Sequence, residues 1–329
     1  MISTMPIESA TVLCGNKNLF YHDIGPRERT PRLALVGDLR GTGLNGMFVL
    51  SRLAAFLSGI HSGQVPGSRL RERVVIVPVT NILELPATRI AKRPRTHVDQ
   101  RRSLWGATTE ALVALTRTAY YRVEIQQNSP DIEDMPQVCL YAPSDDERAT
   151  ACLFGLPAVI ERPMEPGAGS DLRRAWRLLG GENFSVHIGQ AGTLCTSYCE
   201  DLFKALVSFL DRTGIVDGLN LTDEEDRLRY FDLRQVFVVL AEQSGIFSSS
   251  VAVGRWVRAG AELGRIYDCF TGGGRARMVA PVTGLVASLR RQPLLCKGEL
   301  LARILVPTGA SSRGRLTPVG KAAWPMGQT

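Results

Sequence analysis

Short apolar runs alternate with amphipathic stretches over the first 230 or so residues. The runs are rich in β-branched and aromatic residues, which is typical of buried strands, and they lie at 32–38, 73–81, 120–126, 157–162 and 184–190. Between them apolar residues recur at helical spacing, which predicts helices at 44–57, 108–115, 145–155 and 199–214. Strands separated by helices predict an α/β fold with helices on both faces of a sheet.

The pattern changes after about Leu233, where short strand-like runs and many glycines replace the helical periodicity. Residues 244–266 and 283–304 resemble each other, which predicts a strand-turn-strand unit repeated at an interval of about 38 residues. Such a repeat is typical of the β-sandwich of biotinyl and lipoyl domains. Those domains carry their prosthetic group on a lysine of the joining hairpin. Residues 267–281 contain no lysine, so a structural or oligomerising module is expected.

This change of pattern predicts the domain boundaries. We expect an α/β domain over residues 1–233, a C-terminal β-domain over residues 234–307, and a disordered tail over residues 308–329, which is rich in Gly, Ser, Pro and Arg. A chain of 329 residues is long enough for one large and one small domain.

The composition is that of an ordinary globular protein, with 44% hydrophobic and 22% charged residues. No apolar run approaches the length of about 18 residues that a membrane-spanning helix requires, and residues 1–15 lack the features of an export signal. Among the seven cysteines, Cys195 and Cys199 have a C-x-x-x-C spacing, which is not that of a metal or redox motif. We therefore expect reduced thiols and a cytoplasmic location.

The net charge of +7 favours anionic partners. One dense basic run covers residues 89–102, but no aromatic platform for stacking bases accompanies it, so the sequence does not favour a nucleic-acid partner. The run is either a solvated basic loop or part of a site for a small polyanion.

Three glycines between the first predicted strand and the first predicted helix, Gly41, Gly43 and Gly46, form the pattern G-x-G-x-x-G. This pattern occurs at the pyrophosphate-binding turn of dinucleotide-binding proteins. Such a site also needs an acidic residue at the end of the second strand to bind the ribose, and that position is Asn81 here. The glycines are therefore interpreted as turn residues that let the chain pass from strand to helix.

Five further blocks are spaced as in one known family. They are GDLRGTGLNG (37–46), PVTN (78–81) with Arg89 beyond it, DQRRSLWG (99–106), EIQQ (124–127) and VHIG (186–189). With the glycine pattern of 245–264, they resemble the succinylglutamate desuccinylase/aspartoacylase family of zinc deacylases over about residues 30–305. The resemblance implies a zinc-carboxypeptidase-like mixed sheet with helices on both faces, followed by the small β-domain.

The resemblance also implies which positions would hold zinc. In the family, a histidine and a glutamate of the first block and the histidine of the fourth bind the metal, and these positions are Arg40, Gly43 and Gln126 here. Arginine remains protonated, glycine has no side chain, and a glutamine amide is a poor zinc ligand. The glutamate that accepts a proton from the metal-bound water corresponds to His187. A lost zinc site and no cofactor are therefore expected.

The family's substrate-binding arginines correspond to Arg89 and Arg102, and the asparagine beside the second is Arg101 in this chain. Guanidinium groups are suited to bidentate binding of carboxylates. Arg40 would add a permanent positive charge where the zinc ion would lie, and Gln126 would add an amide. These residues predict a site for a small anionic ligand.

Other interpretations use some of the same residues. Asp38, Asp99, Glu124 and His187 lie at predicted strand ends or in the sequence blocks, so they could form a relocated metal site. His187 could activate the Cys195 thiol as a nucleophile, although no acidic residue that would orient it is evident. His187 could also be a hydrogen-bonded structural histidine in an apolar strand.

These observations together predict a degenerate deacylase. We expect it to bind an anionic, N-acyl amino acid-like ligand or to act as a noncatalytic subunit beside an active homologous subunit, in a homo- or hetero-oligomer. The alternative is an active hydrolase of N-acyl amino acids that uses zinc at a non-standard site. A nucleic-acid-binding adaptor rests only on the basic charge, and it predicts salt-dependent binding.

Overall fold

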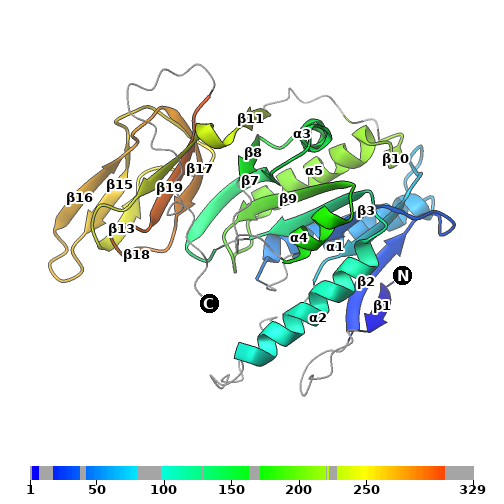
Figure 1. Cartoon of the computed structure of the whole chain (residues 1–329). Helices are drawn as coiled ribbons and strands as arrows, with labels where there is room; N and C mark the ends of the chain where they lie inside the picture. The colour runs from blue at the N-terminus through cyan, green and yellow to red at the C-terminus, as the bar shows by residue number, and fades with distance from the viewer. Residues whose placement is uncertain are drawn as a thin grey trace.

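The computed structural model describes residues 2–6, 18–37, 42–79, 98–127, 129–162, 171–219, 221 and 228–307, and only the backbone over 98–105. Its centre is a mixed sheet of 13 strands (Figure 1). The main path of this sheet is β1 (Ile2–Pro6), β2 (Asn18–Ile24), β5 (Arg73–Val77), β3 (Pro31–Val36), β6 (Tyr121–Gln126), β9 (Glu182–Gly189), β7 (Ile132–Tyr141), β17 (Gly284–Arg290), β19 (Leu300–Leu305) and β12 (Val236–Leu240). The strands attached beside this path are β8 (Ala158–Arg162), β11 (Arg229–Phe231) and β14 (Trp256–Val257).

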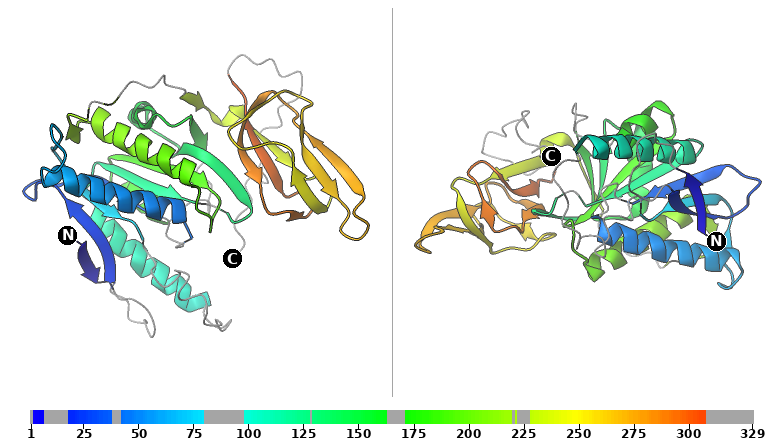
Figure 2. Two further views of the ribbon diagram at one scale, coloured as in Figure 1. Left: turned by 180° about the vertical axis from the view of Figure 1, so that it is seen from behind. Right: turned by 90° about the horizontal axis from the view of Figure 1, so that it is seen from below.

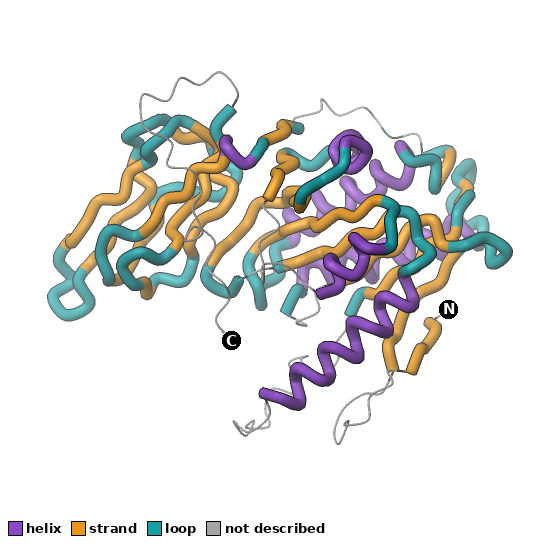
Figure 3. Tube along the Cα trace, viewed as in Figure 1, coloured by secondary structure: helices purple, strands orange, loops and turns teal. Residues whose placement is uncertain are grey.

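Helices cover both faces of the sheet, as the alternating pattern predicts. One face is covered by α1 (Leu44–His61) and α5 (Thr196–Arg212), and the other by α2 (Val98–Thr116) and α4 (Asp171–Leu178) (Figure 2). The short helix α3 (Asp145–Ala151) and the 3-10 turn η3 (Cys152–Phe154) follow β7. Figure 3 shows the strands of the sheet between these helical layers. Among the described helices, none has the length and apolar composition needed to cross a membrane.

Alternate residues of the central strands separate the two faces chemically. Val123, Ile125 and Val186 belong to the main apolar cluster, which α1 and α5 complete. The residues between them face α2 and α4. Near β3 and β5 this second face is also apolar, and Val36 and Val77 pack there with residues of α2 and α4. Towards β6, β9 and β7 it becomes polar.

A close approach of α1 to β6 explains the last glycine of the G-x-G-x-x-G pattern. A Cβ atom at Gly46 would lie 2.9 Å from Cγ2 of Ile125, which is fully buried. The helix could not keep this distance with a larger residue. The glycine therefore serves helix-on-strand packing.

Several elements differ from the sequence prediction. α2 begins at Val98, well before residue 108, so the DQRRSLWG block and the end of the basic run lie in the helix. The strands β1, β2 and β7 and the helix α4 were not predicted. β7 contains Pro136 and adjacent acidic residues, and its register shifts between Asp134 and Gln137, so it lacks the alternation of a regular strand.

The C-terminal repeat forms equivalent strands. β13 (Gly245–Ser249), β14 and β15 (Glu262–Tyr267) correspond to β17, β18 (Leu294–Leu295) and β19. The two repeats exchange strands. β18 of the second repeat pairs with β13 of the first, and β14 of the first repeat pairs with β17 of the second. A second sheet has the order β16 (Gly274–Val279), β15, β13 and β18, and a separate apolar cluster fills the space between the two sheets.

β17 also pairs with β7, so the large sheet continues from the α/β part into the C-terminal strands. Within the described residues, 236–305 contain strands and no helix. Because the sheet is shared, a separate domain over residues 234–307 stays a prediction. The tail over residues 308–329 lies outside the described residues. The remaining strands, β4 (Arg69–Leu70) and β10 (Val216–Asp217), form a small antiparallel pair.

Candidate functional site

Three segments meet at the carboxyl ends of the parallel strands β6 and β9. The backbone N–H of Gly192, after β9, donates to the carbonyl of Thr42, before α1 (3.0 Å). The N–H of Asn45 donates to Oε1 of Gln127, at the end of β6 (3.0 Å), and Nε2 of Gln127 donates to the carbonyl of Gln190 (2.6 Å). The structure therefore brings the first, fourth and fifth sequence blocks together.

Asn45 and Gln127 hold this junction, although the sequence analysis did not single them out. Oδ1 of Asn45 accepts the N–H of Cys195, where α5 begins (2.7 Å). Gly189 ends β9 with a φ of +66°, and a Cβ atom there would lie 2.5 Å from Nδ2 of Asn45. Only glycine fits this contact and this backbone conformation. The hydrogen-bond partners of Asn45 are 82 and 150 residues away in the sequence, so no local pattern indicates its role.

Gln126 and His187, two of the predicted site residues, are neighbours on adjacent strands. They are register partners in the parallel pair β6–β9, and both side chains lie on the face covered by α2 and α4. Gly43, at the N-cap of α1, belongs to the loop that meets this edge. The three positions therefore lie at one end of the sheet.

His187 is enclosed by polar side chains. Its Nε2 lies 3.5 Å from the hydroxyl of Tyr141, and its Nδ1 lies 4.0 Å from a carboxylate oxygen of Asp134. Asp134 accepts a hydrogen bond from Oγ of Ser288 (2.5 Å) and lies 3.8 Å from the guanidinium of Arg303. Both of these residues come from the C-terminal strands, so those strands help to orient the histidine.

Two buried arginines, Arg162 and Arg303, and the partly buried Arg173 act on the imidazole through their charges. Burial, and then the positive charges of Arg162, Arg173 and Arg303, lower the pKa of His187 well below its usual 6.5, so the ring is uncharged at pH 7. Burial and the charge of Arg162 also lower the pKa of Arg303 to about 10, and its guanidinium therefore remains protonated. The carboxylates of Glu124 and Asp134 lie beside two of these guanidinium groups and partly balance their charge.

Arg173 reaches the cluster from α4. Its guanidinium lies 3.6 Å from the carboxylate of Glu124 and 4.2 Å from the centre of the Tyr141 ring. Glu124 is fully buried on β6, two residues before Gln126. One of the four residues proposed for a relocated metal site is therefore ion-paired with an arginine.

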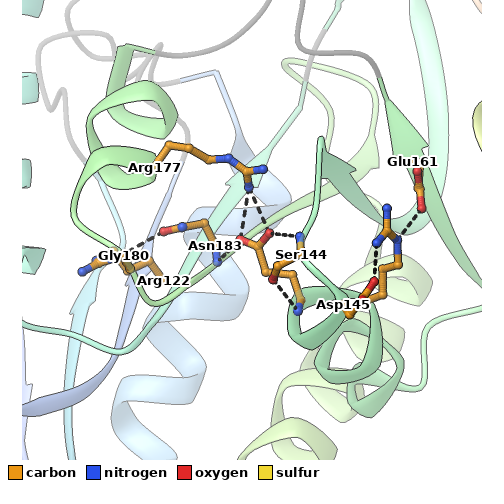
Figure 4. A network of polar contacts seen from close by, with 9 residues as sticks. Arg122, Ser144, Asp145, Glu161, Arg177, Gly180 and Asn183 are labelled. Carbon is orange, nitrogen blue, oxygen red and sulfur yellow. Dashed lines mark hydrogen bonds and ion pairs between the residues drawn. The ribbon is translucent and has the colours of Figure 1, made fainter.

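A second network fixes α4 against β9 (Figure 4). Glu147 in α3 accepts hydrogen bonds from Nη1 of Arg177 in α4 (2.9 Å) and from the N–H of Asn183 in β9 (3.0 Å). Glu147 also forms a capping box with Ser144. This carboxylate therefore positions the helix that supplies Arg173.

Several predicted residues cannot be placed relative to this cluster. Those outside the described residues are Asp38, Arg40, Asn81 and Arg89. Those for which only the α2 backbone is described are Asp99, Arg101 and Arg102. Their roles in ligand or metal binding stay predictions.

The alternative sites receive no support from the described side chains. Within the described part of the chain, no three His, Cys, Asp or Glu side chains are close enough to share a metal ion. The Sγ atom of Cys195 lies 3.3 Å from Oγ of Ser197 at the start of α5. A relocated metal site and a thiol nucleophile therefore remain hypotheses of the sequence.

No protein-family model matches this sequence, and no curated protein matches it. Solved structures match almost all of it. The product-bound ectoine utilization protein EutE (DoeB) from Ruegeria pomeroyi is 21% identical, with a TM-score of 0.68 over 92% of this chain and 93% of that chain. A succinylglutamate desuccinylase/aspartoacylase from Rhodobacter sphaeroides is 16% identical, with a TM-score of 0.69 over 92% and 94%. A succinylglutamate desuccinylase from Silicibacter sp. is 17% identical, with a TM-score of 0.64 over 93% and 94%. The chain has the succinylglutamate desuccinylase/aspartoacylase fold.

The resemblance predicted from the sequence blocks is confirmed at the level of this fold. The described residues do not fit the zinc ion that the resemblance implies. Gly43 offers no ligand atom, and Gln126 offers only an amide oxygen. His187 lies between the arginines and Asp134, and Glu124 contacts Arg173. Gly43 and Gln126, at two of the positions that the resemblance assigns to metal ligands, therefore do not fit zinc, and the third position, Arg40, lies outside the described residues.

Proposed function

We propose that this protein is a noncatalytic relative of succinylglutamate desuccinylase/aspartoacylase proteins that binds a small anionic ligand of the N-acyl amino acid type. One observation carries the proposal. Gly43, Gln126 and an uncharged His187 lie together where the three sequence blocks meet, and the resemblance assigns the first two to metal ligands and the third to the general base.

The chemistry of amide hydrolysis supports the absence of turnover. A zinc deacylase needs the metal to generate a hydroxide nucleophile near pH 7, and neither glycine nor a carboxamide replaces that function. His187 is also a weakened base, because burial and then the neighbouring guanidinium groups lower its pKa.

The charges of the cluster support an anionic ligand. Arg162, Arg173 and Arg303 are protonated and almost completely buried around the predicted site residue His187. Guanidinium groups in such surroundings bind carboxylates strongly. The names of the matching structures, which refer to succinylglutamate and to an aspartoacylase, suggest acylated amino acids as the class of ligand.

A noncatalytic role also suits a subunit that joins an active homologous chain. The C-terminal residues 234–307 would then act as a β-domain of the biotinyl/lipoyl type that supports assembly, and their own apolar cluster supports this assignment. Native purification followed by mass determination tests it. The expected result is a stable homo- or hetero-oligomer, and a monodisperse monomer would contradict it.

An active hydrolase with a non-standard site is the second candidate. The alignment of Tyr141, His187 and Asp134 favours it, because a histidine between a carboxylate and a hydroxyl resembles a proton relay. The two distances of 3.5 and 4.0 Å are longer than normal hydrogen bonds.

A turnover screen separates the two candidates. Purified protein is incubated with a panel of N-acetyl and N-succinyl amino acids, with and without added zinc, and free amine is measured together with ligand binding. We expect binding of anionic members and no release of amine. Turnover that is lost in a His187→Gln variant would contradict the proposal and favour the hydrolase.

A further inference from the structure

A cavity of about 330 Å³ lies at the amino ends of β3 and β5, where β2, the loop before β3 and the end of α2 meet. The candidate site lies at the carboxyl ends of β6 and β9, which run parallel to β3. The cavity is therefore at the opposite edge of the sheet. Pockets that hold small molecules have volumes of about 300–1,000 Å³, so this cavity suits a small ligand.

The loop over residues 25–30 forms one wall of the cavity, and β5 holds this loop in place. Gly25 is buried with a φ of +110°, and a Cβ atom there would lie 2.6 Å from the carbonyl oxygen of Glu72. Nη1 of Arg73 donates to the carbonyl of Arg29 (3.2 Å). The wall therefore has a defined shape before any ligand binds.

Two of the arginines at the cavity already have carboxylate partners. Nε and Nη2 of Arg73 donate to the two carboxylate oxygens of Asp23 (2.7 and 2.6 Å). Nη1 of Arg29 donates to the carboxylate of Glu72. These pairs support the wall, and their charges are balanced within the chain.

Arg27 and Glu28 add one further charge of each sign. Both side chains line the cavity and are exposed, and neither forms a hydrogen bond or an ion pair with any described residue. Leu115 and Thr118, at the end of α2, line the same cavity, and the carboxyl end of a helix favours a positively charged group. The accessible charges therefore suit a ligand that carries one anionic and one cationic group.

Apolar side chains complete the lining. They are Pro31 from β3, Val75 from β5 and Leu115 from α2. Val75 belongs to the apolar cluster between the sheet and α2, and Leu115 packs against this cluster. An apolar part of a ligand would be removed from water on this side of the cavity.

We propose that this cavity binds a free α-amino acid with an apolar side chain, at a second site remote from His187. Arg27 binds the carboxylate, Glu28 and the end of α2 bind the ammonium group, and Val75 and Leu115 contact the side chain. Guanidinium–carboxylate and ammonium–carboxylate contacts are among the stronger hydrogen bonds of proteins. The inference goes beyond the proposed function, because a ligand at this edge of the sheet would be an effector and not a substrate.

Calorimetry on the full chain tests the inference with matched ligands. The tightest-binding of L-valine, L-leucine and L-methionine is compared with its amide, which lacks the carboxylate, and with its 2-hydroxy acid, which lacks the ammonium group. We expect wild type to bind the amino acid about tenfold or more tightly than either analogue, because each analogue loses one charge-assisted contact.

Two variants assign the two ends of the ligand. Arg27→Gln should reduce the preference for the amino acid over its amide to nearly one and keep the preference over the hydroxy acid. Glu28→Gln should have the reverse effect. Arg69→Gln and Glu242→Gln, at exposed positions that do not line the cavity, are the matched controls and should change neither preference.

The outcomes distinguish this inference from the proposed function. Arg27→Gln should leave the binding of N-acyl amino acids unchanged, since these bind at the other edge of the sheet. If Arg27→Gln weakens both classes of ligand together, they share one site and the second site is wrong. If wild type binds none of the three amino acids, or if both variants keep the wild-type preferences, the inference is overturned and the proposed function stands.

Discussion

At the residue scale, His187 decides the chemistry of the buried polar cluster. The resemblance assigns this position to the carboxylate that acts as the base in the family. Burial and then the positive charges of the three arginines at 162, 173 and 303 lower the pKa of His187, whereas the same positive charges would favour the anionic form of a glutamate. The surrounding charges are therefore consistent with an anionic group at this point. In this protein the ligand would supply that group.

The protonation state of His187 is directly testable. Its pKa in the folded protein is well below 6.5, so below about pH 6.5 the unfolded chain binds a proton that the folded chain does not. His187 should therefore contribute to stability above pH 6.5, and that contribution should fall as the pH decreases, by at most about 1.4 kcal/mol per pH unit. Denaturant unfolding of wild type and His187→Gln between pH 8 and 5 measures it.

The expected result is that the stability difference between the two proteins shrinks towards low pH. Nuclear magnetic resonance of the imidazole provides the control, since the signal should stay in the neutral range at pH 6. A midpoint near 6.5 would contradict the enclosure of His187 by the arginines.

At the scale of elements, the packing of α1 on β6 positions the loop that contains Gly43. Gln127 accepts from the N–H of Asn45 in the first turn of this helix, which therefore has a hydrogen-bond partner from another element where Gly43 provides no side-chain cap. Gly46 permits the short distance to Ile125. The start of α1 and the end of β6 are thus fixed together.

Two glycine substitutions in the same helix should have opposite effects. Gly46→Ala would place a Cβ atom 2.9 Å from the buried Ile125 side chain, so we expect a loss of about 1–3 kcal/mol of unfolding free energy. Gly59→Ala is the matched control, because the atom nearest to its Cβ would be the flexible end of the Gln64 side chain at 3.6 Å. It should be neutral or stabilising by up to about 1 kcal/mol. Equal effects in chemical unfolding would contradict the close approach.

The elements that the sequence predicts well are those in which apolar residues recur at a regular spacing. The run at 73–81 corresponds to β5, which is almost wholly apolar, and the run at 184–190 corresponds to β9, in which apolar and polar residues alternate. β7 could not be predicted, since it contains Pro136 and its buried residues include the polar Asp134 and Gln137, so it lacks a regular apolar pattern. This unpredicted strand contributes Asp134, Gln137 and Tyr141 to the candidate site.

At the scale of the whole molecule, the two C-terminal repeats meet the same steric requirement. A Cβ atom at Gly245 would lie 2.3 Å from the carbonyl oxygen of Tyr267, and one at Gly284 would lie 2.3 Å from that of Leu305. These are equivalent positions of the two repeats. The second repeat also joins β7, so its strands support both the β-sandwich and the site.

Alanine at either glycine should therefore be destabilising to a similar degree. We expect Gly245→Ala and Gly284→Ala each to lower the unfolding free energy by at least about 2 kcal/mol, because a backbone carbonyl cannot move as a side chain can. Gly274→Ala, which has open space around its Cβ position, should have little effect. A destabilised protein with alanine at one of the two glycines and a neutral one with alanine at the other would refute the equivalence of the repeats.

The candidate site was predictable only in part. The sequence blocks indicated Gln126 and His187, and the structure places them side by side. The arginines at 162, 173 and 303 carry no recognisable spacing, because they come from a strand end, a helix and a C-terminal strand. Such a cluster is created by the topology and becomes visible only in three dimensions.

Zinc calorimetry tests the central claim most directly. Wild type is titrated with zinc beside a variant that restores the family's ligands, Arg40→His with Gly43→Glu and Gln126→His. We expect no stoichiometric zinc binding to wild type and one zinc ion per chain in the variant. Equal circular dichroism spectra of the two proteins serve as the control for folding. One tightly bound zinc ion per wild-type chain would contradict it.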